Sequence, residues 1–411
     1  MVSGSAAFKI LFSIAVECAQ QSRRLVNADV LLVRHDVDCG YTYNGRAYSH
    51  ILDSVAEILQ RNNKNFLTVA SPYSALIGHR AYGDPCSINF RYALATIKSR
   101  LLFGGDYVSS NVLEKKKVWR SLIESVSPKI IIGIAPGPDL CWAAQELDIP
   151  IYDFQHGTIN DGHPVYKNIL RDWPDKYVPS GFLCWDEIAA ETLSWARERG
   201  KDVRIVGNPW FSRFINKFHD DKLVEESLRR EGQGNDNKKT ILVTLQWGLG
   251  ESFQDPKYYK YISPSLVDLI NETKFSINWL IRLHPVQYRS SRRETFQFLE
   301  EKFGKEGSVR WWLPTTQPLP QVLSECDLHI TDSGSTTVEA AWFGIPTALL
   351  NDRFRVGGML ENYYKKERDL GFAQCVQQDK VSIYEWICRH HRLPSGTWKE
   401  RDLINFLMTI K

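Results

Sequence analysis

Hydroxyl side chains are concentrated in the stretch TDSGSTT (residues 331–337), which lies between a short apolar strand and a helical pattern. The N–H groups of a first helical turn lack partners and the helix dipole is positive there, so such a turn is suited to an anion. A simple cap needs one hydroxyl, whereas this turn holds five hydroxyl residues. Glu339, one turn into the helix, could bind a ribose diol or complete a capping box with Thr336. The pattern predicts a phosphate site.

Two further loops follow predicted strands in the same half of the chain. Strand 240–247 leads into Gly248, and strand 278–284 ends in His284-Pro285. The carboxyl ends of parallel strands meet at one edge of a sheet, so these loops and the turn would face one anion. A packed or surface histidine is the alternative for His284. The predicted anion-binding residues are His284, Pro285, Ser333, Gly334, Ser335, Thr336, Thr337, Glu339 and Gly248.

The N-terminal half offers a histidine and several carboxylates that could act as a base. The segment DFQHGTIND brings His156 to the end of a strand, where Gly157 allows close backbone approach. A neutral imidazole there can take a proton from a hydroxyl group. Asp36 and Asp38, which follow the first strand, are alternative bases or caps of a solvated turn. The remaining candidates are the carboxylates Asp153 and Asp161, and the substrate-binding side chains Arg34, Tyr43 and Arg46.

Near-continuous apolar strands alternate with amphipathic helices along the chain, which is typical of parallel sheets covered on both faces. The charged stretch 217–239 interrupts this alternation. We therefore predict two doubly wound Rossmann-like domains facing across a cleft: residues 1–217, a linker 218–239, and residues 240–411, whose last helices could pack back on the first domain. The predicted strands are 30–35, 65–70, 129–135, 149–155, 176–184, 203–207, 240–247, 278–284, 309–313, 328–330 and 346–350.

Composition narrows the class of protein. The hydrophobic and charged fractions, 43% and 24%, are those of a soluble globular protein, and a net charge of +3 is too mild to suggest a nucleic-acid partner. The eight cysteines have no CxxC spacing, which indicates a reducing compartment and argues against a disulfide framework or a zinc site. The apolar run FKILFSIAV (residues 8–16) is too short to span a bilayer. We expect a cytoplasmic protein.

The motifs IPIYDFQHG, VGNPWFSRF, ILVTLQWG, IRLHP and ITDSGSTTVEAAWFGIPTALL, in this order, resemble the landmarks of GT-B fold proteins. The chain is similar to UDP-N-acetylglucosamine 2-epimerases and to bacterial surface-polysaccharide glycosyltransferases. Its His-Pro dipeptide and Ser/Thr cluster resemble motifs of CMP-Kdo and sialic acid transferases. The epimerases have Glu-Ala-Gly where this chain has Gln155-His156-Gly157, and Ser-Gly-Gly where it has Ser333-Gly334-Ser335.

The resemblance implies an α/β GT-B glycosyltransferase that needs neither metal nor cofactor. It would move a sugar, first of all a CMP-linked ulosonic acid such as Kdo or sialic acid, from a nucleotide donor to a glycan or lipid-linked glycan in capsule, lipopolysaccharide or O-antigen synthesis. His284 and residues 333–337 would hold the donor, residues Arg34, Tyr43 and Arg46 the acceptor, and His156, Asp36 or Asp38 would be the base. Open alternatives are a UDP-sugar transferase, a UDP-HexNAc 2-epimerase, a CDP-polyol phosphotransferase and a non-catalytic sugar-binding module. Peripheral attachment to the inner membrane or to an assembly complex also stays open.

Overall fold

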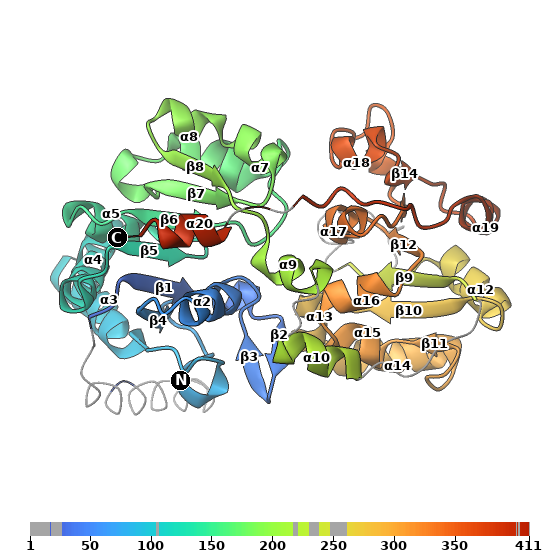
Figure 1. Cartoon of the computed structure of the whole chain (residues 1–411), viewed down its shortest axis with the longest axis horizontal. Helices are drawn as coiled ribbons and strands as arrows, with labels where there is room; N and C mark the ends of the chain where they lie inside the picture. The colour runs from blue at the N-terminus through green and yellow to red at the C-terminus, as the bar shows by residue number, and fades with distance from the viewer. Residues whose placement is uncertain are drawn as a thin grey trace. The chain divides into compact units, whose positions relative to one another are not determined.

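The computed structural model divides the chain into two compact units, residues 1–212 with 400–411, and residues 213–399 (Figure 1). The structure describes residue 17 and residues 27–103, 107–216, 221–229, 238–246, 261–399, 401 and 403–410. The division lies inside α9 (Pro209–Ile215), and the terminal helix α20 (Leu403–Met408) groups with the first unit. Within these ranges no helix is both long and apolar enough to cross a bilayer.

The first unit is built on a parallel sheet with the strand order β4-β1-β5-β6-β7-β8. Its strands are apolar because helices cover both faces. β1 pairs with β4 on one side and with β5 on the other, so the winding reverses between β1 and β5, the point where ligands bind in such sheets. The strands are β1 (Val30–Arg34), β4 (Phe66–Ala70), β5 (Ile130–Gly133), β6 (Ile151–Phe154), β7 (Gly181–Cys184) and β8 (Asp202–Ile205).

Helices pack their apolar sides on this sheet. Trp119, almost fully buried, belongs to the cluster that joins the sheet residues Leu31 and Ile131 to Leu140. The helices of this unit are α2 (Leu52–Arg61), α3 (Asn89–Phe103), α4 (Tyr107–Val126), α5 (Pro138–Glu146), α6 (Leu170–Asp172), α7 (Glu187–Thr192), α8 (Ser194–Glu198), and the terminal α20.

The segment after β1 forms a hairpin, whose two short strands are not among the predicted ones. β2 (Tyr41–Tyr43) and β3 (Arg46–Tyr48) pair antiparallel through Asn44-Gly45, both with positive φ. This is the geometry of a two-residue primed turn, for which Asn-Gly is a strong signal. The rings of Tyr43 and Tyr48 pack edge to face with centroids 6.1 Å apart, which places them in the core of the hairpin.

The second unit repeats the architecture with the strand order β11-β10-β9-β12-β13-β14, so its switch point lies between β9 and β12. The predicted strand 309–313 is wrong beyond Arg310, because Glu306 accepts hydrogen bonds from the Trp311 and Trp312 amides and starts a helix there. The strands are β9 (Thr240–Thr244), β10 (Asn278–Arg282), β11 (Val309–Arg310), β12 (Leu328–Thr331), β13 (Thr347–Leu349) and β14 (Ala373–Cys375). The helices are α10 (Lys222–Arg229), α12 (Pro264–Thr273), α13 (Pro285–Ser290), α14 (Arg292–Phe303), α15 (Trp312–Thr316), α16 (Leu319–Ser324), α17 (Thr336–Trp342), α18 (Lys365–Asp369) and α19 (Lys380–Arg389).

Helix α10 lies within the stretch that we interpreted as a linker. Asp221 accepts two hydrogen bonds, each 2.6 Å long, from the Arg213 guanidinium, and both side chains are buried. The same carboxylate accepts the amides of Leu223 and Val224 and caps the helix. Asp221, a charged residue of the predicted linker, therefore forms a buried ion pair and caps a helix.

His329 is a fully buried histidine in the middle of the second sheet. Its Nε2 lies 2.8 Å from Thr244 Oγ1 on β9, and its Nδ1 lies 3.0 Å from Thr347 Oγ1 on β13. Burial lowers the pKa of His329 to about 3, so the ring stays neutral and links three strands.

We expect this histidine to make the second unit sensitive to acid. The unfolded chain takes up a proton on His329 below its ordinary pKa of about 6.5, whereas the folded chain does so only near pH 3, so stability falls between these values as the pH falls. Relative to His329→Leu, the wild type should lose roughly 2 kcal/mol between pH 6.5 and pH 5, at about 1.4 kcal/mol per pH unit. Thermal melts at several pH values measure this. A melting temperature of the wild type that does not fall relative to that of His329→Leu as the pH is lowered would contradict this expectation. His79→Leu, at an exposed histidine, is the control.

Candidate functional site

The turn that follows β12 rests on the ends of β9 and β12, at the switch point of the second sheet. The register places Thr331 beside Thr244 and Thr244 beside Arg282. Thr331 Oγ1 donates to the Thr244 carbonyl at 3.2 Å and accepts the Gly334 amide at 3.2 Å. Gln246 Nε2 also approaches Thr331 Oγ1, at 3.4 Å. One threonine hydroxyl therefore fixes the turn to both strands.

Gly334 is required at this turn because of its neighbours. A Cβ on Gly334 would lie 2.5 Å from Gln246 Nε2 and 2.8 Å from Thr331 Oγ1, both closer than real Cβ atoms come to other atoms. The turn thus approaches the strand ends more closely than any other residue type allows.

The hydroxyl residues of the turn differ in their roles. Thr337 is fully buried, and both its hydroxyl (2.8 Å) and its amide (3.2 Å) donate to the Gly334 carbonyl, so it holds the turn together instead of facing an anion. Ser335 is exposed and Thr336 half-buried, and their amides belong to the first turn of α17, whose N–H groups lack helical partners. The half-buried Ser333 offers its carbonyl to the Tyr364 hydroxyl at 3.1 Å.

Two partly buried charged side chains lie behind this turn. Burial raises the pKa of Glu339 to about 7, although the Arg282 guanidinium and a hydrogen bond with Thr336 act in the opposite direction. Burial lowers the pKa of Arg282 to about 10, and its Nη1 donates to the carbonyls of Gln317 (2.8 Å) and Pro314. Glu339 is thus linked to Thr336 and Arg282, and a contact between Glu339 and a ribose stays a prediction.

His284 is connected to the same edge of the second sheet by hydrogen bonds through two glutamine side chains. It is the N-cap of α13, with Pro285 in the first turn; its Nδ1 accepts the Val286 amide at 3.2 Å, so the ring proton lies on Nε2. The His284 amide donates to Gln287 Oε1, and Gln287 Nε2 donates to the Gln246 carbonyl at 2.9 Å. The structure therefore connects His284 to the turn 331–336 through Gln287 and Gln246. Gly248 lies outside the described residues.

In the first unit, His156 follows β6 at the carboxyl edge of the sheet. Gln155 holds the loop that follows His156: its Oε1 accepts the Trp185 amide at 2.7 Å, and its Nε2 donates to the Gly157 carbonyl at 2.8 Å. Burial, together with the neighbouring imidazoles of His35 and His163, lowers the pKa of His156 to about 4. His156 is therefore neutral at physiological pH.

The carboxylates after β1 have structural partners, which differs from their predicted role as bases. Asp38 is buried and accepts Ser49 Oγ at 2.5 Å and the Ile51 amide at 2.9 Å, and burial raises its pKa to about 6. Asp36 accepts Ser74 Oγ at 2.5 Å and the Ala75 amide at 3.3 Å. Both side chains hold the loops at this edge.

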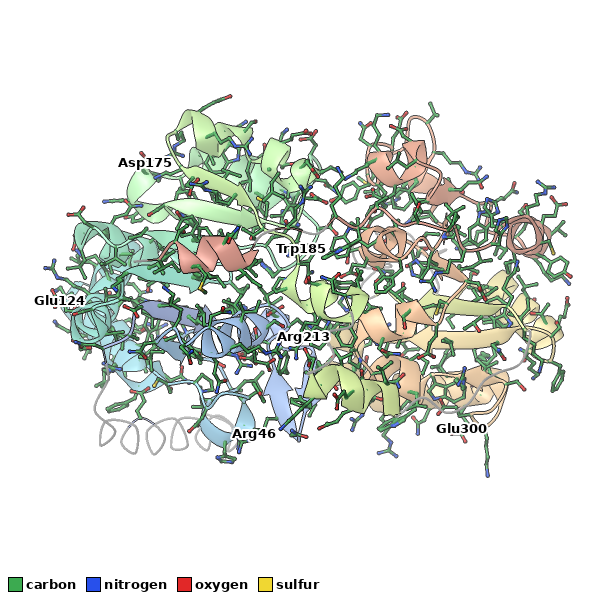
Figure 2. All side chains as sticks on the ribbon, in the orientation of Figure 1. Arg46, Glu124, Asp175, Trp185, Arg213 and Glu300 are labelled. Carbon is green, nitrogen blue, oxygen red and sulfur yellow. The ribbon has the colours of Figure 1, made fainter. Side chains whose placement is uncertain are left out.

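The predicted acceptor-binding residues differ in burial and in their contacts. Arg34 is buried, 3.3 Å from Asp53, and donates to the carbonyls of Tyr82 and Ala47, so its guanidinium supports the fold. Tyr43 is buried in the hairpin, whereas Arg46 is exposed on β3 (Figure 2).

The two remaining carboxylates also have partners. Asp153 is buried and accepts the Ala135 amide at 2.9 Å and the Tyr166 hydroxyl at 3.0 Å. Asp161 is exposed and pairs with Lys167. Neither is placed beside His156 by these contacts.

His35 and His163 accompany His156; sequence reasoning placed His35 in the loop after the first strand but missed His163. His35 directly follows β1, and His163 is followed by a proline, as His284 is; this second His-Pro pair was the available signal. In the part of the chain that the structure describes, no group of three or more His, Cys, Asp or Glu side chains could hold a metal ion.

No protein-family model and no curated protein matches the chain. Solved structures match almost its whole length. The UDP-GlcNAc 2-epimerase from Neisseria meningitidis, bound to UDP-GlcNAc, is 14% identical, covering 88% of this chain and 90% of that one, with a TM-score of 0.52. The UDP-GlcNAc 2-epimerase from Methanocaldococcus jannaschii is 13% identical over 93% of this chain and 99% of that one, also with a TM-score of 0.52. The predicted fold class, α/β with two Rossmann-like domains of the GT-B type, is confirmed.

Proposed function

We propose that this protein is a glycosyltransferase that takes its sugar from a nucleotide donor. The observation that carries the proposal is the turn 331–336, which Gly334 seats on the ends of β9 and β12 with Ser335 and Thr336 at its outer side. Helix-start amides and hydroxyls at a switch point are suited to the phosphates of a nucleotide.

The leaving nucleotide would be stabilised without a metal or a cofactor. Charge-assisted hydrogen bonds from the amides of Ser335 and Thr336, from their hydroxyls and from His284 Nε2 would act on the phosphate oxygens as negative charge develops there. Arg282 lies behind the turn, beside Glu339, and adds positive charge.

The first unit would bind the acceptor and supply the base. His156 is the base that we propose, because it is neutral and follows a strand end, whereas Asp36 and Asp38 accept hydrogen bonds from their own loops. The proton that His156 accepts would come from a hydroxyl group of the acceptor, which we propose to be a glycan or lipid-linked glycan in bacterial surface-polysaccharide synthesis. The proposed transfer reaction would take place in the cytoplasm, at the inner membrane.

The donor is either a UDP-linked or a CMP-linked sugar. The solved neighbours are named for UDP-GlcNAc, which favours a UDP-linked donor over the CMP-linked ulosonic acid that the motifs suggested.

A UDP-HexNAc 2-epimerase is the second candidate, since the neighbours with this fold carry that name. An epimerase needs no acceptor, so incubation with UDP-GlcNAc alone separates the two functions. Gln155-His156-Gly157, at the place of the epimerases' Glu-Ala-Gly, favours the transferase.

The phosphate site can be tested with Ser335→Ala/Thr336→Ala. We expect weaker nucleotide binding, by roughly 1.5–3 kcal/mol for each charged hydrogen bond lost, and a smaller change in the melting temperature without ligand, which comes from the lost hydrogen bond between Thr336 and Glu339. Thermal shifts with CMP, CDP, UDP and GDP measure both quantities. Thr337→Val is the matched control: it should melt earlier, because the bond to Gly334 is lost. Normal nucleotide binding by the double variant would place the donor elsewhere.

A further inference from the structure

Two histidines of one loop, His156 and His163, each have a buried Nδ1 atom that finds no hydrogen-bond partner among the described residues. A buried polar atom without a partner costs about 1–3 kcal/mol, so each of these two atoms calls for a partner such as a water or a ligand. Neither atom is needed to explain the fold of the loop, which other groups hold.

The loop is built firmly around these two rings. Asn160 turns the chain: its Oδ1 accepts the Gly162 amide at 3.0 Å, and its carbonyl accepts the His163 amide at 2.9 Å. A π-helical turn, Val165–Ile169, follows directly. Such turns are rare and are often found at functional sites.

A chain of contacts ties His163 to the edge of the sheet. Its ring packs edge to face on Tyr166, with centroids 4.9 Å apart. The Tyr166 hydroxyl donates to Asp153 at 3.0 Å, and the other oxygen of Asp153 accepts the amide of Ala135, which follows β5 with a positive φ. His163 is therefore positioned from the carboxyl ends of β5 and β6, the edge that also carries His156.

The surroundings favour a neutral ligand over a cation or a carboxylate. The titratable neighbours of His156 are the imidazoles of His35 and His163, and burial lowers the pKa of all three rings, which favours their neutral forms. A neutral imidazole offers one donor and one acceptor nitrogen. A pair of such rings matches an alcohol, which donates one hydrogen bond and accepts another.

We propose that His163 and His156 together form the subsite for the reacting hydroxyl group of a sugar acceptor. This inference rests on the proposed glycosyltransferase function and adds His163 to it. The hydroxyl donates to Nδ1 of His156 and accepts from Nδ1–H of His163. As the oxygen bonds to the anomeric carbon, its proton passes to His156, the bond from that carbon to the phosphate oxygen breaks, and the electron pair leaves with the nucleotide.

The first test compares His163→Leu, His163→Asn and His79→Leu. Asparagine keeps an amide near the place of Nδ1, leucine removes it, and His79 is an exposed histidine of the same unit. Transfer to methyl glycosides is measured with UDP-GlcNAc and CMP-sialic acid as donors. His163→Leu should raise the KM for the glycoside roughly tenfold and leave the KM for the donor unchanged, which the loss of one hydrogen bond explains. His163→Asn should recover most of the loss, and His79→Leu should match the wild type.

If the wild type transfers sugar and His163→Leu keeps the wild-type KM for the glycoside, the inference is overturned while the function stands. Equal changes in both KM values, without recovery in His163→Asn, also overturn it, since they indicate a structural role.

If the wild type shows no transfer, the function fails with these donors and the subsite is tested separately with diethyl pyrocarbonate, which acylates neutral imidazole nitrogens. Methyl glycosides should slow the modification of His156 and His163, read by peptide mass spectrometry, and leave His79 unaffected. The absence of this protection overturns the inference.

Discussion

Replacing His156 by alanine should lower kcat by about 10²–10⁴-fold, the usual contribution of a general base, and leave the affinity for the donor nucleotide unchanged. The His156 imidazole is a neutral group at the carboxyl edge of the first sheet, whereas the phosphate turn belongs to the other unit. Steady-state kinetics with a fixed donor measure the first quantity, and thermal shift with the nucleotide measures the second.

The pH dependence adds a second criterion for the same residue. With a pKa of about 4, His156 is neutral above that value, so kcat/KM should stay level from pH 7 to about pH 5 and fall as the pH drops through 4. Asp36→Asn and Asp38→Asn are the controls, and Asp38→Asn should act on stability because Ser49 and Ile51 bond to that carboxylate. Full activity in His156→Ala together with an inactive Asp36→Asn would identify Asp36 as the base.

Most strands of the two sheets could be predicted because they are largely buried and so have a continuous apolar run. β14 (Ala373–Cys375) was not predicted, since only one of its three residues is buried. Periodicity alone could not resolve residues 309–313, since the apolar run Trp311-Trp312-Leu313 suits a strand or a helix equally. The Glu306 side chain favours the helix, because it accepts hydrogen bonds from the amides of Trp311 and Trp312. The hairpin after β1, by contrast, carried a readable Asn-Gly signal between tyrosines.

The candidate site could be predicted where the local backbone defines it. It could not be predicted where a side chain bonds to a residue that is distant in the sequence. The turn 331–336 follows from a strand, a glycine and a helix start. Arg34 looked like a ligand because it ends a strand, but it pairs with Asp53 on α2. Sequence spacing shows neither this pair nor the unsatisfied Nδ1 of His163.

The largest effect on donor binding should come from the smallest change, Gly334→Ala. The added methyl group would lie 2.5 Å from Gln246 Nε2 and 2.8 Å from Thr331 Oγ1. The Gln246 amide ends a flexible side chain and can move, but Thr331 Oγ1 is held by the Thr244 carbonyl and cannot. The turn must therefore lift off the strand ends, which moves both the amides and the hydroxyls that would meet the phosphate. We expect nucleotide binding to fall below detection, with overpacking costing about 1–3 kcal/mol of stability.

Isothermal titration with the preferred nucleotide measures this effect, and Gly307→Ala is the matched control because its nearest atom would be 3.8 Å from the new Cβ. A double-mutant cycle separates steric displacement from general damage. Thr331→Ala should weaken binding by itself, since it removes the hydroxyl that seats Gly334. In Gly334→Ala/Thr331→Ala the methyl group gains room, so the double variant should bind better than the sum of the single losses predicts. Strict additivity would mean that the two residues do not act through this contact, and wild-type affinity in Gly334→Ala would exclude the turn as the donor site.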